Sequence, residues 1–246
     1  MDSEFQDTAY PAFKRYLRSL SEEEFARFQR RLIPGETILG VRMPLLRAVA
    51  RRIAKGDWRR FLAEARDDTL EEVMVQGLVI GFAKMEYDEE LLRAAAFVPK
   101  IKSWASCDLC GSSFRFLRKN RERSFAFLLP YLQSSGEFAV RFGVILLMDY
   151  FIDEEYLDRL FTALDGVRHG GYYAKMAVAW AVSACYVKYQ RRTLDYLSRC
   201  RLDDWTYNRA LRKITESNRV DAASKRKIRS MRRRAVPAPK PRGAKA

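Results

Sequence analysis

The amino-acid sequence predicts an all-α protein whose helices stack in pairs as a helical-repeat superhelix, an α-α solenoid. No segment shows an apolar–polar alternation of period two that is long enough for a useful strand. Short amphipathic segments of about 9–18 residues are joined by short polar turns instead. Helix pairs recur at intervals of about 35–45 residues, and such a pair buries its apolar stripe only by stacking on neighbouring pairs. A closed helical bundle is the competing architecture.

The length and the net charge of the chain limit the functions that it can have. The chain has 246 residues, 48% of them hydrophobic, and a formal net charge of +15. We expect a single helical domain over residues 1–234 and a cationic concave face, and therefore a polyanionic partner, nucleic acid before membrane. Residues 235–246 are rich in Pro, Ala and Lys and are predicted to be disordered, either adding non-specific nucleic-acid affinity or only solubilising the chain. Without a secretory segment or an apolar run that could span a bilayer, a cytoplasmic monomer is expected.

The first two helices follow from apolar spacing and a capping signal. Residues 9–20 place Tyr10, Phe13 and Leu17 on one stripe. The segment Ser21-Glu22-Glu23-Glu24 resembles a capping box, with Ser21 as the N-cap of a helix that carries Phe25, Phe28 and Leu32. Pro34-Gly35 ends that helix.

The third helix, over 44–55, begins with Pro44 at its N1 position. Leu46, Val49 and Ile53 lie on one side, and the other side is cationic, with Arg47 and Arg51. This face either contacts phosphates or is an ordinary solvated surface.

The remaining helices follow from the same spacing and from local caps. Asp57 caps 58–65, Val75, Leu78 and Val79 point inward from 71–84, and Asp88 opens 88–97. Further helices are predicted over 121–132, 137–151, 154–164, 171–189, 192–199, 205–217 and 222–234.

The stretch Lys102-Ser103-Trp104-Ala105-Ser106-Cys107-Asp108 is the centre of the chain. We expect a helix to begin here and to run on through residues 113–117. Trp104 and Asp108 are four residues apart and therefore share one face of that helix. Two companion helices each carry one unusual residue, Arg141 in an apolar segment and Trp180 among small residues.

The cysteines predict neither a metal site nor a cofactor. Cys107-x-x-Cys110 has the spacing of half a zinc site or of a redox pair. A zinc site needs four ligands, whereas His169 has no ligand-like neighbours, and no strand precedes the pair as a redox motif requires. The four cysteines are therefore interpreted as reduced, partly buried thiols.

Five segments carry a resemblance to a known family. In order they are Leu39-Gly-Val-Arg-Met-Pro-Leu-Leu-Arg47, Ser103-Trp-Ala-Ser-Cys-Asp108, Val140-Arg-Phe-Gly-Val-Ile145, Ala177-Val-Ala-Trp180 and Leu202-Asp-Asp-Trp-Thr-Tyr-Asn208. Together they resemble the DNA alkylation repair family of HEAT-like repeat proteins, the AlkD-like glycosylases, over about residues 39–220. The family fold is a superhelix of antiparallel helix pairs, and its excising members hydrolyse the N-glycosidic bond of cationic purines in duplex DNA, such as 7-methylguanine and 3-methyladenine.

The resemblance implies roles for individual residues. Trp104, Asp108 and Trp180 match the family's catalytic positions, and Arg141 matches a position that binds DNA. Arg42, Arg47, Arg51 and Lys102 are expected to contact DNA as well. A carboxylate near C1′ stabilises a cationic sugar and orients water, and indole faces favour the same cation. The alternatives are core packing for the tryptophans, a helix-start role for Asp108 and a buried partner, Glu137 or Asp149, for Arg141. A non-catalytic protein that binds distorted or branched DNA is the competing function, and a protein–protein scaffold leaves the charge unexplained.

Overall fold

The computed structural model describes residues 10–234 and divides the chain into two compact units, Met1–Asn120 and Arg121–Ala246. The predicted disorder of residues 235–246 lies outside the described residues. The single domain over 1–234 stays a prediction. All regular structure over residues 10–234 is helical, which confirms the all-α class.

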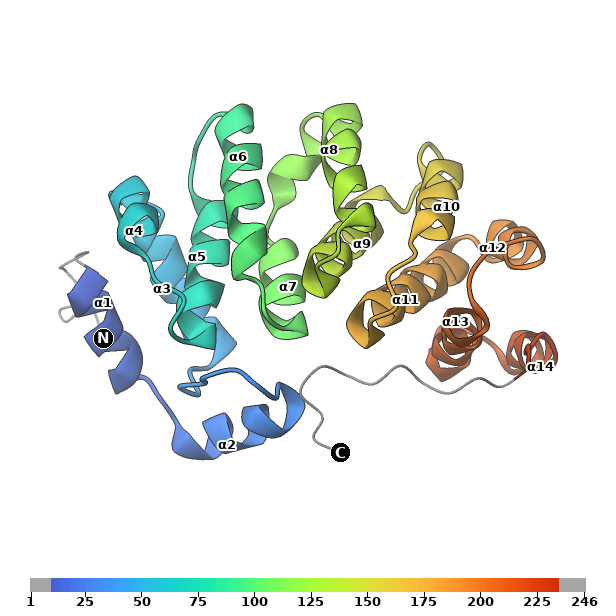
Figure 1. Cartoon of the computed structure of the whole chain (residues 1–246), viewed down its shortest axis with the longest axis horizontal. Helices are drawn as coiled ribbons and strands as arrows, with labels where there is room; N and C mark the ends of the chain where they lie inside the picture. The colour runs from blue at the N-terminus through green and yellow to red at the C-terminus, as the bar shows by residue number, and fades with distance from the viewer. Residues whose placement is uncertain (1–9, 235–246) are drawn as a thin grey trace. The chain divides into compact units, whose positions relative to one another are not determined.

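Unit 1 contains seven α-helices and two short 3-10 helices within residues 10–120 (Figure 1). In chain order they are α1 (Tyr10–Ser19), α2 (Glu23–Leu32), α3 (Met43–Ile53), α4 (Trp58–Glu64), α5 (Leu70–Phe82), α6 (Tyr87–Phe97), η1 (Val98–Lys100), α7 (Trp104–Gly111) and η2 (Arg115–Arg118).

Unit 2 contains seven α-helices and one 3-10 helix within residues 121–234. In chain order they are α8 (Arg121–Leu128), η3 (Leu129–Gln133), α9 (Glu137–Phe151), α10 (Leu157–Gly166), α11 (Tyr172–Lys188), α12 (Gln190–Leu197), α13 (Asp204–Glu216) and α14 (Ala222–Ser230).

Each unit is built from two layers of alternating helices. In unit 1, α5 packs between α3 and α7, and α6 covers α5 from the other layer (Figure 1). Helix α5 is buried almost all round, from Leu70 to Ile80, because helices of both layers surround it. In unit 2, α11 packs between α9 and α13, while α8 and α10 contact α9, α12 contacts α11 and α14 contacts α13. Stacked helix pairs are therefore the repeating element of both units, as the spacing predicts.

Several local predictions are wrong. Pro44 is the second residue of α3, not the first, and α6 begins at Tyr87 with Glu86 as its N-cap rather than at Asp88. Ser21 does not cap α2: the N-cap is Glu22, and the Ser21 hydroxyl donates to the Arg18 carbonyl instead. Helix α7 does not run on through residues 113–117, because it ends at Gly111 and a separate 3-10 helix follows. The capping box lies at α5, where Thr69 and Glu72 cap each other's backbone amides.

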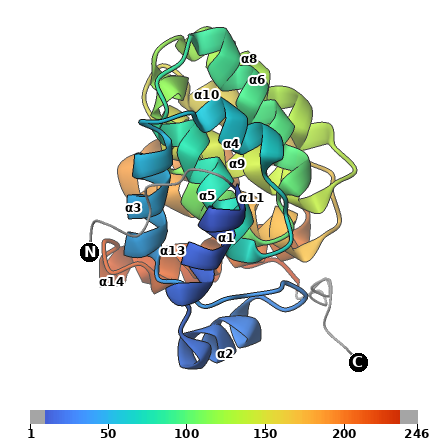
Figure 2. The same cartoon turned by 90° about the vertical axis from the view of Figure 1, so that its left-hand side faces the viewer.

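Helix α2 lies apart from the stacked layers of unit 1 (Figures 1 and 2). The loop that follows it, residues 33–42, returns the chain to α3. Gly40 in this loop has φ +86, and a Cβ there would lie 2.3 Å from the Glu22 carbonyl oxygen and 2.7 Å from the Ala26 nitrogen. Only glycine permits both this backbone conformation and this close approach, so Gly40 fixes where α2 begins.

Candidate functional site

The predicted site residues lie on both units. Unit 1 carries Trp104 and Asp108 on α7 and Lys102 just before it. It also carries the three predicted arginines, Arg42, Arg47 and Arg51, on and before α3. Arg141 on α9 and Trp180 on α11 belong to unit 2.

The N-terminus of α7 presents Trp104 and Asp108 on one face. Ser103 is the N-cap, and its hydroxyl accepts from the Ser106 amide, which satisfies one of the open donors of the first turn. Trp104 is the first helical residue and Asp108 lies one turn further on, as predicted. Both side chains are half-buried, so each is in contact with the protein and with solvent.

Trp104 is fixed by a contact that links α7 to α2. Its indole Nε1 donates to the Leu32 carbonyl at 3.3 Å, across 72 positions of sequence. Leu32 is the last residue of α2, where helix carbonyls have no partner within the helix. The ring therefore closes the C-terminal end of α2 and keeps one orientation at the start of α7.

A second carboxyl group, Glu36, lies beside this helix start. It is half-buried, and the Ser103 hydroxyl hydrogen-bonds to it. Burial raises the pKa of Glu36, while the Ser103 hydrogen bond and the nearby Lys102 charge lower it in part. Lys102 is an exposed residue that pairs with Asp67 at 2.9 Å. Sequence reasoning missed Glu36, because no periodicity brings a loop residue onto a helix 67 positions away.

Replacing Glu36 by Gln is expected to stabilise the protein at pH 7. Because its folded pKa lies above the unfolded value of about 4.3, stability associated with this group is present at low pH and is lost as the pH rises through the folded pKa. The amide still accepts from Ser103 and carries no charge. Urea denaturation midpoints should therefore rise for Glu36→Gln at pH 7, and the gain should shrink as the pH falls toward 4.

The control for this experiment is Glu24→Gln, which removes the same charge from an exposed position. Equal midpoints for wild type and Glu36→Gln at pH 7 and pH 8 would contradict the burial argument.

The loop that carries Glu36, residues 33–42, is held in place by hydrogen bonds to Glu71. One carboxylate oxygen accepts from the Gly40 amide at 2.7 Å and the Val41 amide at 3.3 Å, and the other accepts from the Leu39 amide at 3.0 Å. Glu71 is buried on α5. Three consecutive amides thus take the place of solvent around a buried carboxylate. This contact sets the conformation of the loop and, through it, the position of Leu32 against Trp104.

The three predicted arginines near α3 differ in their surroundings. Arg42 is paired with Glu22 at 2.8 Å and lies over the Phe25 ring at 4.1 Å, so it joins α2 to α3. Arg47 is half-buried, and no carboxylate of residues 10–234 forms an ion pair with it. Arg51 is exposed and lies over the Phe82 ring at 5.0 Å. Arg47 and Arg51 are therefore the better candidates for a phosphate contact.

In unit 2, Arg141 is a buried residue at the junction of α9 and α11. It is 5% exposed, and its Nη1 donates to the Tyr173 carbonyl at 3.1 Å. One turn earlier on α9, the buried Glu137 accepts from the Tyr173 amide at 2.6 Å. A Cβ on Gly171, the α11 N-cap, would lie 2.4 Å from Glu137 Oε1, so glycine lets Glu137 approach the helix start closely. Arg141 and Glu137 together hold the first turn of α11.

Trp180 lies on α11 and is 41% exposed. Core packing, the alternative for this residue, therefore does not explain it. Two turns closer to the N-terminus of α11, the ring of Tyr173 packs against that of Phe138, with centroids 5.2 Å apart and the ring planes tilted by 32°. Unit 2 thus presents an exposed indole on the same helix whose start Arg141 fixes.

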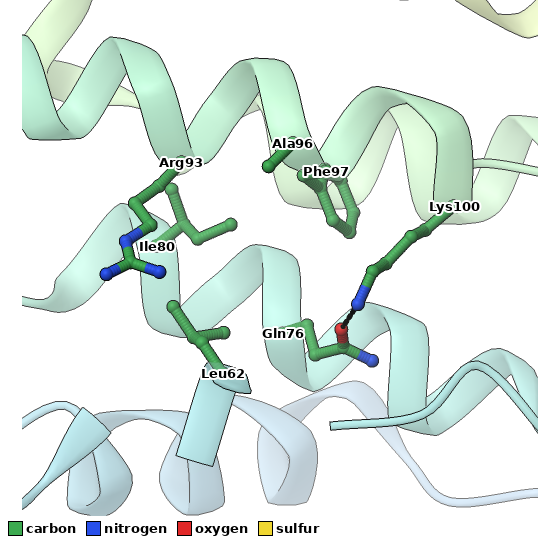
Figure 3. Close-up of a pocket in the computed structure, with 7 residues that line it drawn as sticks. All are labelled: Leu62, Gln76, Ile80, Arg93, Ala96, Phe97 and Lys100. Carbon is green, nitrogen blue, oxygen red and sulfur yellow. Dashed lines mark hydrogen bonds between the residues drawn. The ribbon is translucent and has the colours of Figure 1, made fainter. Parts of the chain in front are cut away.

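A small cavity in unit 1 is separate from these residues. It has a volume of about 60 Å³ and lies between α4, α5 and α6. Figure 3 shows Lys100 at one end, donating to the Gln76 side-chain oxygen at 2.6 Å, and Arg93 at the other. No predicted site residue lines it, so the Trp104–Asp108 face does not depend on this cavity.

The four cysteines are buried free thiols, as predicted. Burial raises the pKa of the Cys110 thiol and raises that of Cys185 to about 12, so neither is a reactive thiolate near neutral pH. Over residues 10–234, no group of three or more His, Cys, Asp and Glu side chains could hold a metal ion. Over the same residues no helix is long and apolar enough to cross a bilayer.

Both units consist of stacked helix pairs, which define an all-α helical-repeat protein. Within unit 1, the capped start of α7 presents an indole and a carboxylate, Trp104 and Asp108. Residues 13–219 match the family described as DNA alkylation repair enzyme, and the chain belongs to this family. Neither the curated proteins nor the solved structures contain a match to the chain. The family match confirms the resemblance found in the five sequence segments.

Proposed function

We propose that this protein is a monofunctional DNA glycosylase that hydrolyses the N-glycosidic bond of positively charged alkylpurines in duplex DNA. The observation that carries the proposal is the Trp104–Asp108 pair on α7, held by the Ser103 cap and by the Leu32 carbonyl. Family membership supplies the substrate class, damaged DNA. The net charge of +15 suits a polyanion.

The reaction asks little of the protein beyond electrostatics. An alkylated purine carries a positive charge, so when the C1′–N bond breaks the base leaves as a neutral molecule with the bonding electron pair. The sugar becomes cationic, a water oxygen bonds to C1′, and one proton is released to solvent. No general acid is needed for the leaving group, and Asp108 stabilises the sugar cation and orients the water.

The other predicted residues have supporting roles. The flat faces of Trp104 and Trp180 are assigned to the sugar, because an indole face attracts a cation. Arg141 is assigned the flanking phosphate; because it is buried and already donates to the Tyr173 carbonyl, this contact requires another of its guanidinium N–H groups to reach the duplex. Arg42 and Lys102 are already paired with Glu22 and Asp67, so their proposed DNA contacts require exchange of those carboxylates for phosphate.

The test is release of 7-methylguanine or 3-methyladenine from methylated duplex DNA by the purified chain. Excess protein over DNA gives a single-turnover rate, and the same DNA without protein gives the spontaneous rate. Release well above the spontaneous rate is expected. Release at the spontaneous rate by protein with an intact melting transition would remove the glycosylase proposal.

The alternative function is DNA binding without chemistry, in which shape and charge select distorted or branched duplexes. Exposed basic residues on α3 and α2 favour it, because they need no catalytic centre. Tight binding to branched DNA, together with no excision by wild type, would support this alternative.

Replacing Arg47 and Arg51 by Ala is expected to weaken binding to all duplexes alike, because phosphate contacts carry no sequence information. The slope of log affinity against log salt should flatten by about one unit for each lost phosphate contact. Fluorescence anisotropy with labelled duplex at several salt concentrations measures this slope. An unchanged slope in the folded double variant would show that this face of α3 is a solvated surface.

A further inference from the structure

Helix α2 has an apolar face that unit 1 leaves uncovered. Of its ten residues only Ala26 is buried. Phe28 and Leu32, four positions apart on one face, are 48% and 49% exposed. Most helices in proteins are stabilised by packing of their apolar face, and a contiguous exposed apolar patch marks an interaction site. The sequence places these residues on the second helix, and the structure shows that they are exposed there.

The face is nevertheless held in place. At the start of α2, Gly40 packs against Ala26, and Arg42 pairs with Glu22. At its end, the Trp104 indole binds the Leu32 carbonyl. Both ends of α2 are fixed by contacts, while the side chains of Phe28 and Leu32 remain exposed. The helix is therefore preorganised for a ligand, because little conformational freedom is lost when the ligand binds.

Two arginines follow the apolar stripe along the helix. Arg27 and Arg31 are exposed, are also four positions apart, and each directly precedes a residue of the stripe. The Arg31 guanidinium lies 5.9 Å from the Phe28 ring centre. Arg30, in contrast, is paired with Glu23 at 2.9 Å. Within residues 10–234 no carboxylate forms an ion pair with Arg27 or Arg31, so both charges face solvent beside the apolar stripe.

We propose that α2 is a second DNA-binding element, in which Phe28 and Leu32 enter the minor groove and Arg27 and Arg31 bind the phosphates at its edge. Proteins that bind the minor groove use apolar wedges such as Phe and Leu with arginines beside them. Successive members of each stripe are separated by about 6 Å along the helix axis, so one α2 helix spans only a few nucleotides.

Charge and position favour DNA over another occupant. An apolar partner protein would have to cover the charges of Arg27 and Arg31. A second copy of this chain would in addition be repelled, because the chain is strongly basic. A polyanion with apolar edges matches both stripes. Because Leu32 is bound to Trp104, a duplex that reaches Trp104 also passes the end of α2. The identity of the partner rests on the proposed function, and the role of α2 does not require that excision occurs.

Two double variants separate the apolar and the ionic contributions. Phe28→Ser with Leu32→Ser is expected to weaken binding to an undamaged duplex roughly tenfold and to leave the salt slope unchanged, because no ionic contact is lost. Arg27→Ala with Arg31→Ala is expected to reduce the salt slope by about 1.8 units, since each phosphate contact contributes about 0.9. Both variants should melt like wild type, because α2 buries only Ala26.

Matched controls come from the same unit. Leu92, 67% exposed on α6, is changed to Ser as the apolar control. Arg59 and Arg60, exposed on α4, are changed to Ala as the charge control. The proposal is overturned if the α2 variants bind like their controls. It is also overturned if wild type self-associates in sedimentation and Phe28→Ser with Leu32→Ser abolishes this, because the face is then an interface between copies.

Undamaged duplex keeps this test separate from the glycosylase test. If wild type excises no base but the α2 variants lose affinity as described, the proposed function fails and the role of α2 stands. If wild type excises and the α2 variants bind and excise like wild type, only the inference about α2 fails.

Discussion

Asp108→Asn is expected to slow single-turnover release of a cationic purine roughly 30- to 1,000-fold. The amide keeps the size of the side chain and still accepts a hydrogen bond, but the negative charge that stabilises the sugar cation is lost. Removal of one preorganised electrostatic group costs on the order of 2–4 kcal/mol in the barrier, which corresponds to this range of rates. DNA affinity should be unchanged or slightly higher, because repulsion between the carboxylate and the phosphodiester is removed.

The control is Asp195→Asn, which makes the same change at an exposed position on α12. Excision rate, duplex affinity and melting curve are measured together for both variants. If Asp108 acts only at the helix start, Asn serves nearly as well there, and rate and stability should hardly move. A wild-type rate in a wild-type fold would remove Asp108 from the mechanism.

Among the single substitutions considered in unit 1, Glu71→Ala is expected to cause the largest loss of stability. Its carboxylate accepts from the amides of Leu39, Gly40 and Val41, and the last two of these contacts are buried. Truncation leaves these donors without a partner, at about 1–3 kcal/mol each. We expect a total of about 4 kcal/mol, measured as a lower midpoint in urea denaturation followed by circular dichroism.

Two further variants test the reason for this loss. Glu71→Gln keeps one acceptor oxygen and should lose less stability than Glu71→Ala. Glu64→Ala removes an exposed carboxylate that pairs with Arg60 on the same helix, and such pairs contribute below about 1 kcal/mol. Equal midpoints for Glu71→Ala and Glu64→Ala would show that the loop over residues 33–42 does not depend on Glu71.

The same loop connects stability with the proposed site. Glu71 holds residues 39–41, Glu36 of this loop contacts Ser103, and Leu32 just before it receives the Trp104 indole. Folded Glu71→Ala protein should therefore excise more slowly than wild type, although Glu71 touches no residue assigned to the chemistry. Rescue of the rate by Glu71→Gln would indicate that loop position is the cause.

The sequence by itself determined the all-α class and most helix positions. Apolar residues at helical spacing need only local chain geometry to be recognised. For α9 the predicted range, 137–151, agrees with the structure at both ends. Asp57 as the N-cap of α4 was also predictable, because a cap bonds to an amide three residues away. The placement of Trp104 and Asp108 on one helical face follows from the same local rule.

Only the tertiary structure decided which faces are covered and which charges are buried. Phe28 and Leu32 have the spacing of a core stripe, yet the two residues are 48% and 49% exposed. Glu71 is a charged residue at the start of α5, yet it is buried, and its three amide partners lie 30–32 positions earlier in the chain. The spacing of apolar residues in the sequence shows which face of a helix is apolar, but not which part of the protein packs against that face. Long-range contacts supply that information, and they exist only once the helices are packed.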